Sequence, residues 1–339
     1  MKSSKRNIGM DIIKGICIIS IVFAHAGHPI IWFGFFMVYG FYFVAGYNFK
    51  DRTGNKFIKE KVLRTYLIFV CANIFMYFIL KALERINDAY GMVDLELVSY
   101  IKIILSFNIV SDMMAPSWFI FPFLLIIIIL YILNKVVKDM RIIALISFVI
   151  FLFTHMFYER LSQIIWCNCA FITNVGSGLF IAVCGCILKN NVNLEKKLFA
   201  GKYSSECFII STIIMFFLEN RVGLDVRAGY CSNPLGNIII IFVGLYWLIF
   251  ISKFLEQTAV LSKIFSVIGK YSMNIMFFHI ISYSLVTLVG YYLCGLAFPT
   301  HWPFAYTEGF GGIVSAIAGI IVPIVATILL QKIRILKLL

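Results

Sequence analysis

Residues 118–133 read WFIFPFLLIIIILYIL, sixteen consecutive positions without a charged side chain, and residues 238–251 form a second run of the same kind. The chain of 339 residues is 62% hydrophobic and 13% charged, with a mean hydropathy of +0.96, whereas soluble domains have about 45–50% apolar and 25% charged residues. This composition excludes a soluble globular enzyme, a disordered chain and a secreted disulfide scaffold. Because a hydrocarbon layer about 30 Å thick needs roughly 20 apolar residues per helix, the sequence predicts an all-α polytopic membrane protein.

Ten stretches are apolar enough to form membrane-spanning helices. The stretches at 142–157 and 203–218 are short for a full crossing, so one of them could be re-entrant and eight spans is the alternative. Between spans, residues 95–107 are expected to form an amphipathic helix on the outer surface. The predicted spans lie near residues 8–26, 29–49, 65–83, 117–134, 142–157, 164–188, 203–218, 235–252, 271–294 and 311–331.

The distribution of basic residues indicates the orientation of these spans. The net charge is +13, from 29 Lys and Arg against 16 Asp and Glu, which on a soluble chain would suggest a nucleic-acid partner. With the N-terminus in the cytoplasm, 22 basic residues fall in cytoplasmic segments and six in external ones, as the positive-inside rule requires. We therefore predict cytoplasmic termini, a location in the cell membrane with lipids as partners, and no nucleic-acid binding.

The nine cysteines lie mostly within the predicted spans. Cys167 and Cys169 are two residues apart, as are Cys184 and Cys186, which places the members of each pair on roughly opposite faces of a helix. We interpret them as small apolar side chains of the core and predict no metal site.

The first predicted span carries three ionisable side chains in MDIIKGICIISIVFAHAGH, residues 10–28: Asp11, Lys14 and His25. At about 100° per residue they fall within a sector of roughly 60°, with the imidazole about 16 Å along the axis from Lys14. A charge in the membrane costs about 2.5–3.5 kcal/mol even on lenient scales, so such residues are functional candidates. Either Asp11 and Lys14 neutralise each other while His25 ends the helix, or all three line a polar cavity. We favour the cavity, because an imidazole there can act as a general base near neutral pH.

These residues are the first of five blocks in which the sequence resembles the acyltransferase-3 family, integral membrane O-acyltransferases that modify cell-surface glycans. In this family an Asp is followed by a basic residue and, eleven positions later, by a His, as in Asp11, Lys14 and His25. Lys14, Ala45 and Lys61 stand where the family usually has Arg, Ser and Arg. The other blocks, in the family's order, are FYFVAGY at 41–47, KEKVLRTY at 59–66, Ser117-Trp118-Phe119, and GKYSMNIMFFH at 269–279.

The resemblance implies one membrane-embedded acyltransferase domain over residues 1–339, without the soluble esterase-like domain that some relatives append. It implies transfer of an acetyl group from cytoplasmic acetyl-CoA, the donor co-substrate, to a hydroxyl of an extracytoplasmic or lipid-linked sugar. His25 would be the general base, and Asp11 would orient Lys14 and keep it charged. A small-molecule transporter built on the same fold is the alternative, and the acceptor and the oligomeric state are left open.

The remaining candidate residues bind the donor or line the cavity. Lys61 and Arg64, at the cytoplasmic start of the third span, are able to bind the CoA phosphates, although the positive-inside rule also accounts for most of the charge in this segment. The oxyanion that develops during transfer needs a donor, either Lys14 or one of the polar residues predicted beside the cavity. The substrate and cavity candidates are Trp118, Ser117, Asn48, His279 and Ser272.

Overall fold

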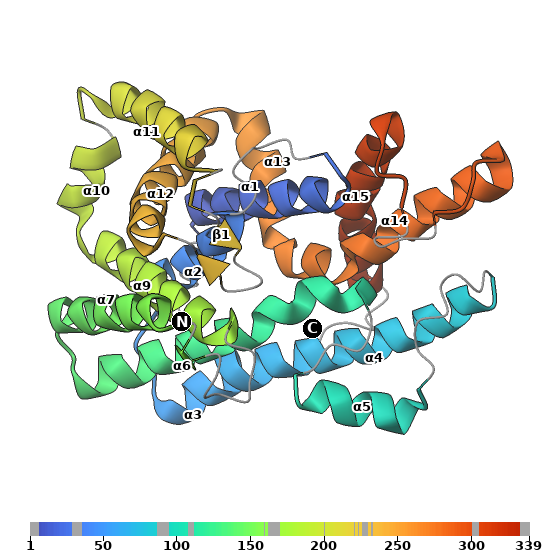
Figure 1. Ribbon diagram of the computed structural model, residues 1–339, viewed down its shortest axis with the longest axis horizontal. Coiled ribbons are helices and arrows are strands. Elements are labelled where there is room, and N and C mark those ends of the chain that lie inside the picture. The colour runs from blue at the N-terminus through green and yellow to red at the C-terminus, as the bar shows by residue number, and fades with distance from the viewer. Residues whose placement is uncertain are drawn as a thin grey trace. The chain divides into compact units, whose positions relative to one another are not determined.

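The computed structural model is built almost entirely of helices (Figure 1). In the described part of the chain the strands β1 (Leu224–Asp225) and β2 (Tyr230–Cys231) pair antiparallel over two residues each. The structure describes residues 7–28, 36–86, 95–107, 112–158, 160–161, 170–199, 201–219, 221–222, 224–225, 230–231, 233–299 and 305–332.

The helices follow the order of the predicted spans, with shorter helices between them. A π-helical segment joins α3 to α4, and a 3₁₀ segment leads into α6. The helical elements are α1 (Ile8–His25), α2 (Met37–Tyr47), α3 (Gly54–Phe57), the π segment (Ile58–Leu63), α4 (Arg64–Glu84), α5 (Leu97–Leu105), the 3₁₀ segment (Asp112–Phe119), α6 (Ile120–Val136), α7 (Met140–Met156), α9 (Ala170–Asn190), α10 (Val192–Phe199), α11 (Ser204–Glu219), α12 (Pro234–Glu256), α13 (Ala259–Lys270), α14 (Ser272–Cys294) and α15 (Gly309–Lys332).

Local sequence explains where several of these helices begin and end. Asp139 caps α7 by accepting a hydrogen bond from the Arg141 amide at 2.8 Å. Asn233 caps α12 in the same way, and Pro234 occupies the first turn, where a missing N–H costs nothing. Helix α14 ends at Gly295, whose φ of 66° is in the left-handed region that glycine adopts readily.

Seven helices in the described residues are long and apolar enough to cross a membrane, which confirms an all-α, multipass membrane protein. Helix α7 has 17 residues and is shorter, while α10 and α11 meet at a bend of 79° and form either a broken span or a re-entrant loop. These helices correspond to the two stretches whose full crossing the sequence left open. Helix α2 covers the second predicted span only from Met37, and residues 29–35 lie outside the described residues. Ten spans with cytoplasmic termini therefore stay a prediction.

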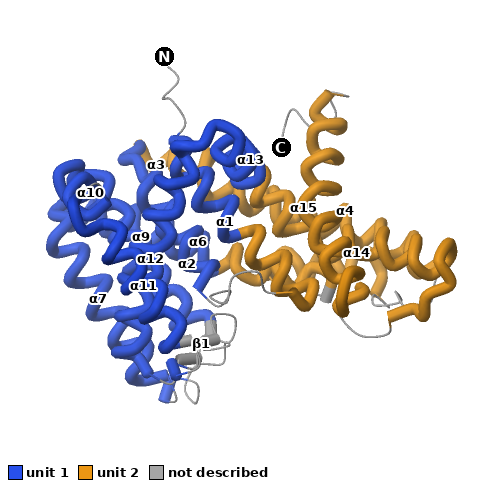
Figure 2. Tube along the Cα trace, turned by 90° about the horizontal axis from the view of Figure 1, so that it is seen from above, with its two compact units in different colours: residues 1–17, 31–52, 122–270 blue, residues 18–30, 53–121, 271–339 orange. Residues whose placement is uncertain are grey.

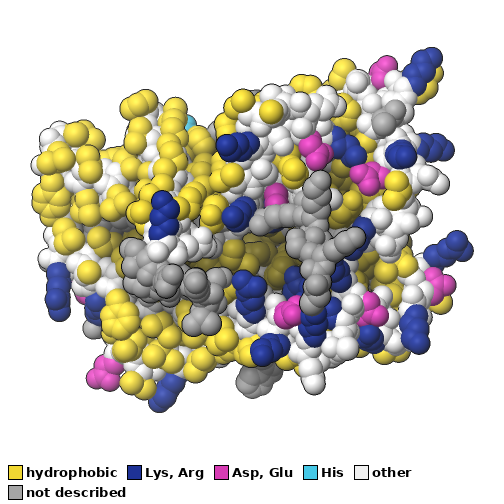
Figure 3. All heavy atoms as spheres, turned by 180° about the vertical axis from the view of Figure 1, so that it is seen from behind, with side chains coloured by type: hydrophobic (Ala, Val, Ile, Leu, Met, Phe, Trp, Pro, Cys, Tyr) yellow, Lys and Arg dark blue, Asp and Glu magenta, His cyan; other side chains and the backbone are white. Residues whose placement is uncertain are grey.

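Large hydrophobic side chains cover much of the surface of these helices. Phe75 and Phe78 on α4, Leu145 on α7 and Phe242 on α12 are all exposed. Figure 3 shows broad hydrophobic areas on one face of the molecule. Such areas are too extensive for contact with water and are expected for helices that face lipid.

The first of two compact units contains the contact between α2 and α9. Gly46 of α2 lies against the backbone of Ala182, and Gly185 of α9 lies against the backbone of Phe43, so that a Cβ at either glycine would overlap the other helix. Small residues allow membrane helices to approach this closely, and the gain is van der Waals contact along both backbones. Unit 1 consists of residues 1–17, 31–52 and 122–270 (Figure 2).

The second unit is organised around α14 and α15, which pack along their length. Asn274 donates a hydrogen bond to the Thr327 hydroxyl at 2.6 Å. Further along, Gly319 of α15 leaves room for the ring of Tyr283, whose hydroxyl donates to the Val22 carbonyl of α1 at 2.6 Å. Unit 2, in orange in Figure 2, consists of residues 18–30, 53–121 and 271–339.

Candidate functional site

The acidic and basic residues near the start of α1 form the ion pair that their spacing predicts. Lys14 Nζ lies 2.8 Å from Asp11 Oδ1; the carboxylate is buried and the ammonium partly exposed. The helix is held here by close backbone packing, because Gly15 faces the Phe265 carbonyl of α13 and Gly269 of α13 faces the Asp11 carbonyl. The glycine of the GKYS block is therefore required for α13 to reach α1 at the ion pair.

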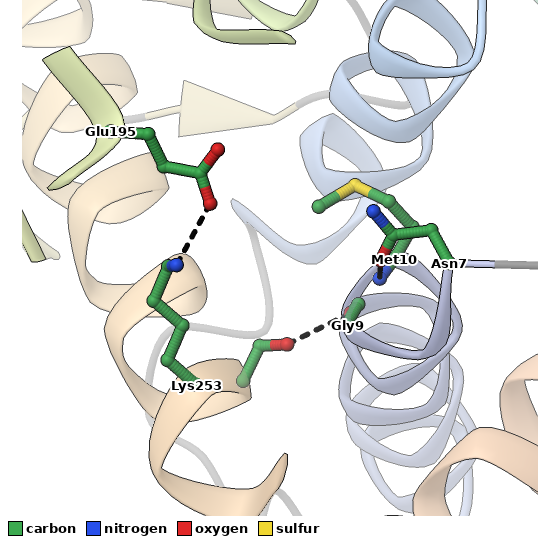
Figure 4. Close-up of polar contacts among 6 residues, drawn as sticks. Asn7, Gly9, Met10, Glu195 and Lys253 are labelled. Atoms are coloured by element: carbon green, nitrogen blue, oxygen red, sulfur yellow. Dashed lines mark hydrogen bonds and ion pairs between the residues drawn. The ribbon is translucent and has the colours of Figure 1, made fainter. Parts of the chain in front are cut away.

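Other polar contacts surround the beginning of α1, as the close-up in Figure 4 shows. Ser252 of α12 donates a hydrogen bond to the Gly9 carbonyl at 2.8 Å, and the Asn7 side chain accepts one from the Met10 amide at 3.1 Å. Lys253, the next residue of α12, forms an ion pair with Glu195 of α10 at 2.8 Å. In unit 1 the start of α1 thus lies among polar and charged groups, which is suited to a membrane surface.

At the other end of α1, His25 is paired with a second histidine from α14. His25 Nδ1 lies 2.8 Å from His279 Nε2, and the two rings are nearly parallel, at 9°, with centroids 5.1 Å apart. His279 is fully buried, whereas His25 is partly exposed. Both residues belong to unit 2.

The backbone of α14 determines which nitrogen of each histidine carries a proton. His279 Nδ1 lies 2.9 Å from the Ile275 carbonyl and 3.0 Å from that of Met276, and a carbonyl can only accept, so Nδ1 is the protonated nitrogen of His279. In neutral His279 the Nε2 atom must then be an acceptor, and His25 Nδ1 must donate to it. We assign the protons from this network. It leaves the lone pair of His25 on Nε2.

Tyr283 secures the two helices that carry the histidines. Its ring lies edge-on to His279, with centroids 5.8 Å apart, and its hydroxyl donates to the Val22 carbonyl of α1. Gly319 of α15 packs against both Tyr283 and Val22. One tyrosine, one turn after His279, therefore fixes the position of α14 against the last turns of α1.

The Ser117-Trp118 block lies in the 3₁₀ segment, which packs against α14 in unit 2. Ser117 is buried, and its hydroxyl donates to the Met114 carbonyl at 2.7 Å, so that its oxygen retains acceptor capacity only. Trp118 is partly buried. In this geometry the Ser117 hydroxyl has no further proton to donate to an oxyanion.

Two other cavity candidates lie at helix ends. Ser272 is buried at the first position of α14, seven residues before His279. Asn48 is exposed just after α2 and belongs to unit 1, as do Asp11 and Lys14. The continuous polar cavity along α1 stays a prediction, because Asp11 and Lys14 belong to one unit and His25 to the other.

The basic residues assigned to the donor lie at the start of α4, in unit 2. Lys61 is in the π-helical segment and Arg64 is the first residue of α4; both side chains are exposed. Lys61 lies in the π-helical segment, so the α-helical rule that residues three apart share a face does not apply to this pair. The π-helical turn was not predicted, although such turns are frequent at functional sites.

Sequence reasoning missed a buried polar cluster centred on His155, in the last turn of α7. The His155 Nδ1 atom lies 2.9 Å from the Phe151 carbonyl, so Nδ1 is protonated and Nε2 accepts. Asn237 of α12 lies 3.2 Å from this Nε2 and Ser177 of α9 lies 3.3 Å from it. His155 thus links three helices of unit 1. The available signal was a histidine and an asparagine, each near the outer end of a predicted span, and a serine in the middle of a third span.

The cysteines that the structure describes take no part in these clusters. Cys186 is buried and its thiol lies 3.1 Å from the Gly46 carbonyl, while Cys184 is partly buried, as expected of core side chains. Cys167 and Cys169 lie outside the described residues. Among the residues that the structure describes, no group of three His, Cys, Asp or Glu side chains could hold a metal ion.

The fold and the sites define an integral membrane protein whose polar residues are concentrated at a few positions on apolar helices. The chain belongs to the acyltransferase-3 family, whose family model, described as an acyltransferase domain, matches residues 7–332. No curated protein and no solved structure matched the chain. The family membership makes this chain an acyltransferase of the multipass membrane class.

Proposed function

We propose that the chain is an O-acetyltransferase of the cell membrane, in which His25 transfers a proton while an acetyl group passes from cytoplasmic acetyl-CoA to a sugar hydroxyl. The acceptor would be an extracytoplasmic or lipid-linked sugar. The observation that carries the proposal is the His25–His279 hydrogen bond, because it gives His25 the protonation pattern of a general base. Membership of an acyltransferase family supports the reaction class.

The proposed reaction is a direct transfer. His25 Nε2 takes the proton from the acceptor hydroxyl, and the oxygen attacks the carbonyl carbon of the acetyl thioester. The bond between this carbon and the CoA sulfur then breaks. The CoA leaves as a thiolate, and the proton stays on His25. While His25 is cationic, its Nδ1–H still donates to neutral His279, so that the hydrogen bond is charge-assisted and stronger in that state.

Lys61 and Arg64 are proposed to bind the phosphates of acetyl-CoA. Both are exposed, lie three residues apart at the start of α4 and carry the charge that phosphate requires. The donor for the developing oxyanion would be the Trp118 indole N–H, which belongs to the same unit as His25. Asp11 would keep Lys14 charged through the ion pair at 2.8 Å.

The decisive experiment uses the variant His25→Asn. An Asn amide N–H reaches the position of imidazole Nδ1 and can still donate to His279, but it has no basic nitrogen. We expect purified full-length protein in detergent to release the CoA thiol from acetyl-CoA, and His25→Asn to lose this activity while eluting and melting like the unmodified chain. Unchanged thiol release in a folded His25→Asn protein would remove His25 from the reaction. A folded, unmodified protein that binds a substrate but never releases thiol would favour the transporter alternative.

A further inference from the structure

Helix α13, between α12 and α14, has three exposed apolar side chains on one face. Val260 is 67% exposed, Ile264 48% and Val267 38%. At about 100° per residue these three side chains fall within roughly 60° of one another, so they form a single stripe. The stripe is defined by these three residues.

The opposite side of α13 packs against α1. Gly269, at about 180° from Val260 around the helix, lies so close to the Asp11 carbonyl that a Cβ would overlap it. The Phe265 carbonyl, in the preceding turn, lies equally close to Gly15. The stripe therefore faces away from the contact with α1.

The chain connections determine what the stripe faces. Two residues, Gln257 and Thr258, join α13 to α12, and Tyr271 alone joins it to α14. Both neighbouring helices qualify as membrane spans, and α13 is too short to cross the roughly 30 Å hydrocarbon layer itself, so both of its ends belong to the same membrane surface. A helix of 12 residues is about 18 Å long, and with both ends held there it extends along the surface. Amphipathic helices in this position bury their apolar face in the acyl-chain boundary.

Two lysines lie on one flank of the stripe. Lys263 and Lys270 are both exposed and fall roughly 60–80° to the same side of Val260. Long basic side chains at such a position place their ammonium groups at the level of lipid phosphates. We propose that α13 is an interfacial helix that binds anionic phospholipid, with the stripe among the acyl chains and Lys263 and Lys270 at the phosphates. The proposal does not rest on the proposed acetyl transfer.

The test places a reporter on the stripe of the full-length protein. Ile264→Trp adds one tryptophan to the five present in the chain, and Ser266→Trp, about 100° from the nearest edge of the stripe, is the matched control. Both proteins are reconstituted into vesicles of phosphatidylcholine and phosphatidylglycerol in which one lipid carries bromine on its acyl chains. Emission of the added tryptophan is obtained by difference from the unmodified chain. We expect its fractional quenching to be at least about twofold larger at position 264 than at position 266.

The identity of the lipid is tested by exchanging the brominated component. At equal mole fraction, brominated phosphatidylglycerol should quench the added tryptophan at position 264 more than brominated phosphatidylcholine, because the lysines enrich anionic lipid locally. Adding Lys263→Gln should reduce this preference, whereas Lys196→Gln, which removes an exposed lysine of α10, should not.

Three results would overturn the proposal. The first is an unquenched tryptophan at position 264, which would mean that a second copy or another protein covers the stripe. The second is equal quenching by both lipids, and the third is a preference that Lys263→Gln leaves unchanged; either would show that the helix does not select anionic lipid. If Ile264→Trp fails to reconstitute, Val260→Trp provides the same measurement.

Discussion

Replacing His279 by Ala removes the group that accepts the His25 Nδ1 proton and leaves His25 itself in place. The two nitrogens are 2.8 Å apart. Because His279 is fully buried, bulk water does not directly replace its Nε2 as the acceptor. If His25 becomes cationic during the reaction, the lost bond is a charge-assisted one. Hydrogen bonds to charged groups are worth about 1.5–3 kcal/mol, which corresponds to a fall in kcat of roughly 10–150-fold.

The variant His279→Gln separates this positioning role from packing. A Gln side chain can place its amide oxygen near the position of Nε2 and accept from His25. We therefore expect His279→Gln to recover most of the activity lost in His279→Ala. The KM for acetyl-CoA should be similar in both variants, because the interaction gains strength only as the reaction proceeds.

The assay is steady-state release of the CoA thiol by full-length protein in detergent, with size-exclusion elution and thermal melting as controls for folding. A kcat in His279→Ala within about twofold of the unmodified protein would refute the proposed relay, since that is below the smallest charge-assisted contribution. Equal loss in the Ala and Gln variants would show that His279 acts through packing alone.

Three further predictions concern other residues. Arg64→Ala should raise the KM for acetyl-CoA by about fivefold with kcat unchanged, because an exposed ion contact is worth about 1 kcal/mol. Lys59→Ala is the control. An unaltered KM would show that the charge of Arg64 reflects only the positive-inside rule. Lys14→Arg should keep activity and Lys14→Met should lose it, because Met removes the ammonium group that lies against the buried Asp11 carboxylate; full activity of the Met variant would show that the charge is not needed. His155→Phe should lower the unfolding free energy by about 1–3 kcal/mol, because the Asn237 amide loses its acceptor; an unchanged melting temperature would contradict this.

Much of the fold follows from patterns within short stretches of sequence. The apolar run at 118–133 lies in the helix that ends at Val136, and the amphipathic stretch at 95–107 forms α5. The Asp11–Lys14 pair needs only an α-helix and a spacing of three residues. Such features depend on the period of one helix, so a single stretch is sufficient to predict them.

The features that the sequence did not predict depend on contacts between residues far apart in the chain, or on short patterns that are weak on their own. His25 and His279 are 254 residues apart, and which nitrogen donates depends on carbonyls of α14. The His155 cluster needs α7, α9 and α12 to meet at one level. Helix α13 lies between two predicted spans, and its 12 residues, in which apolar side chains alternate with serine and lysine, are too short and too polar for a membrane crossing.

The π-helical turn at Ile58–Leu63 has a consequence for the helix that contains it, an unbroken 31 residues from Gly54 to Glu84. A π turn accommodates one residue more than an α turn. The side chains that precede it are therefore rotated about the helix axis by about 100° relative to the side chains that follow it. Lys56 thus points in a different direction from the one that uninterrupted α-helical winding would give it. The π turn thus changes which basic side chains lie on the same face of the helix as Arg64, although the helix itself is not interrupted.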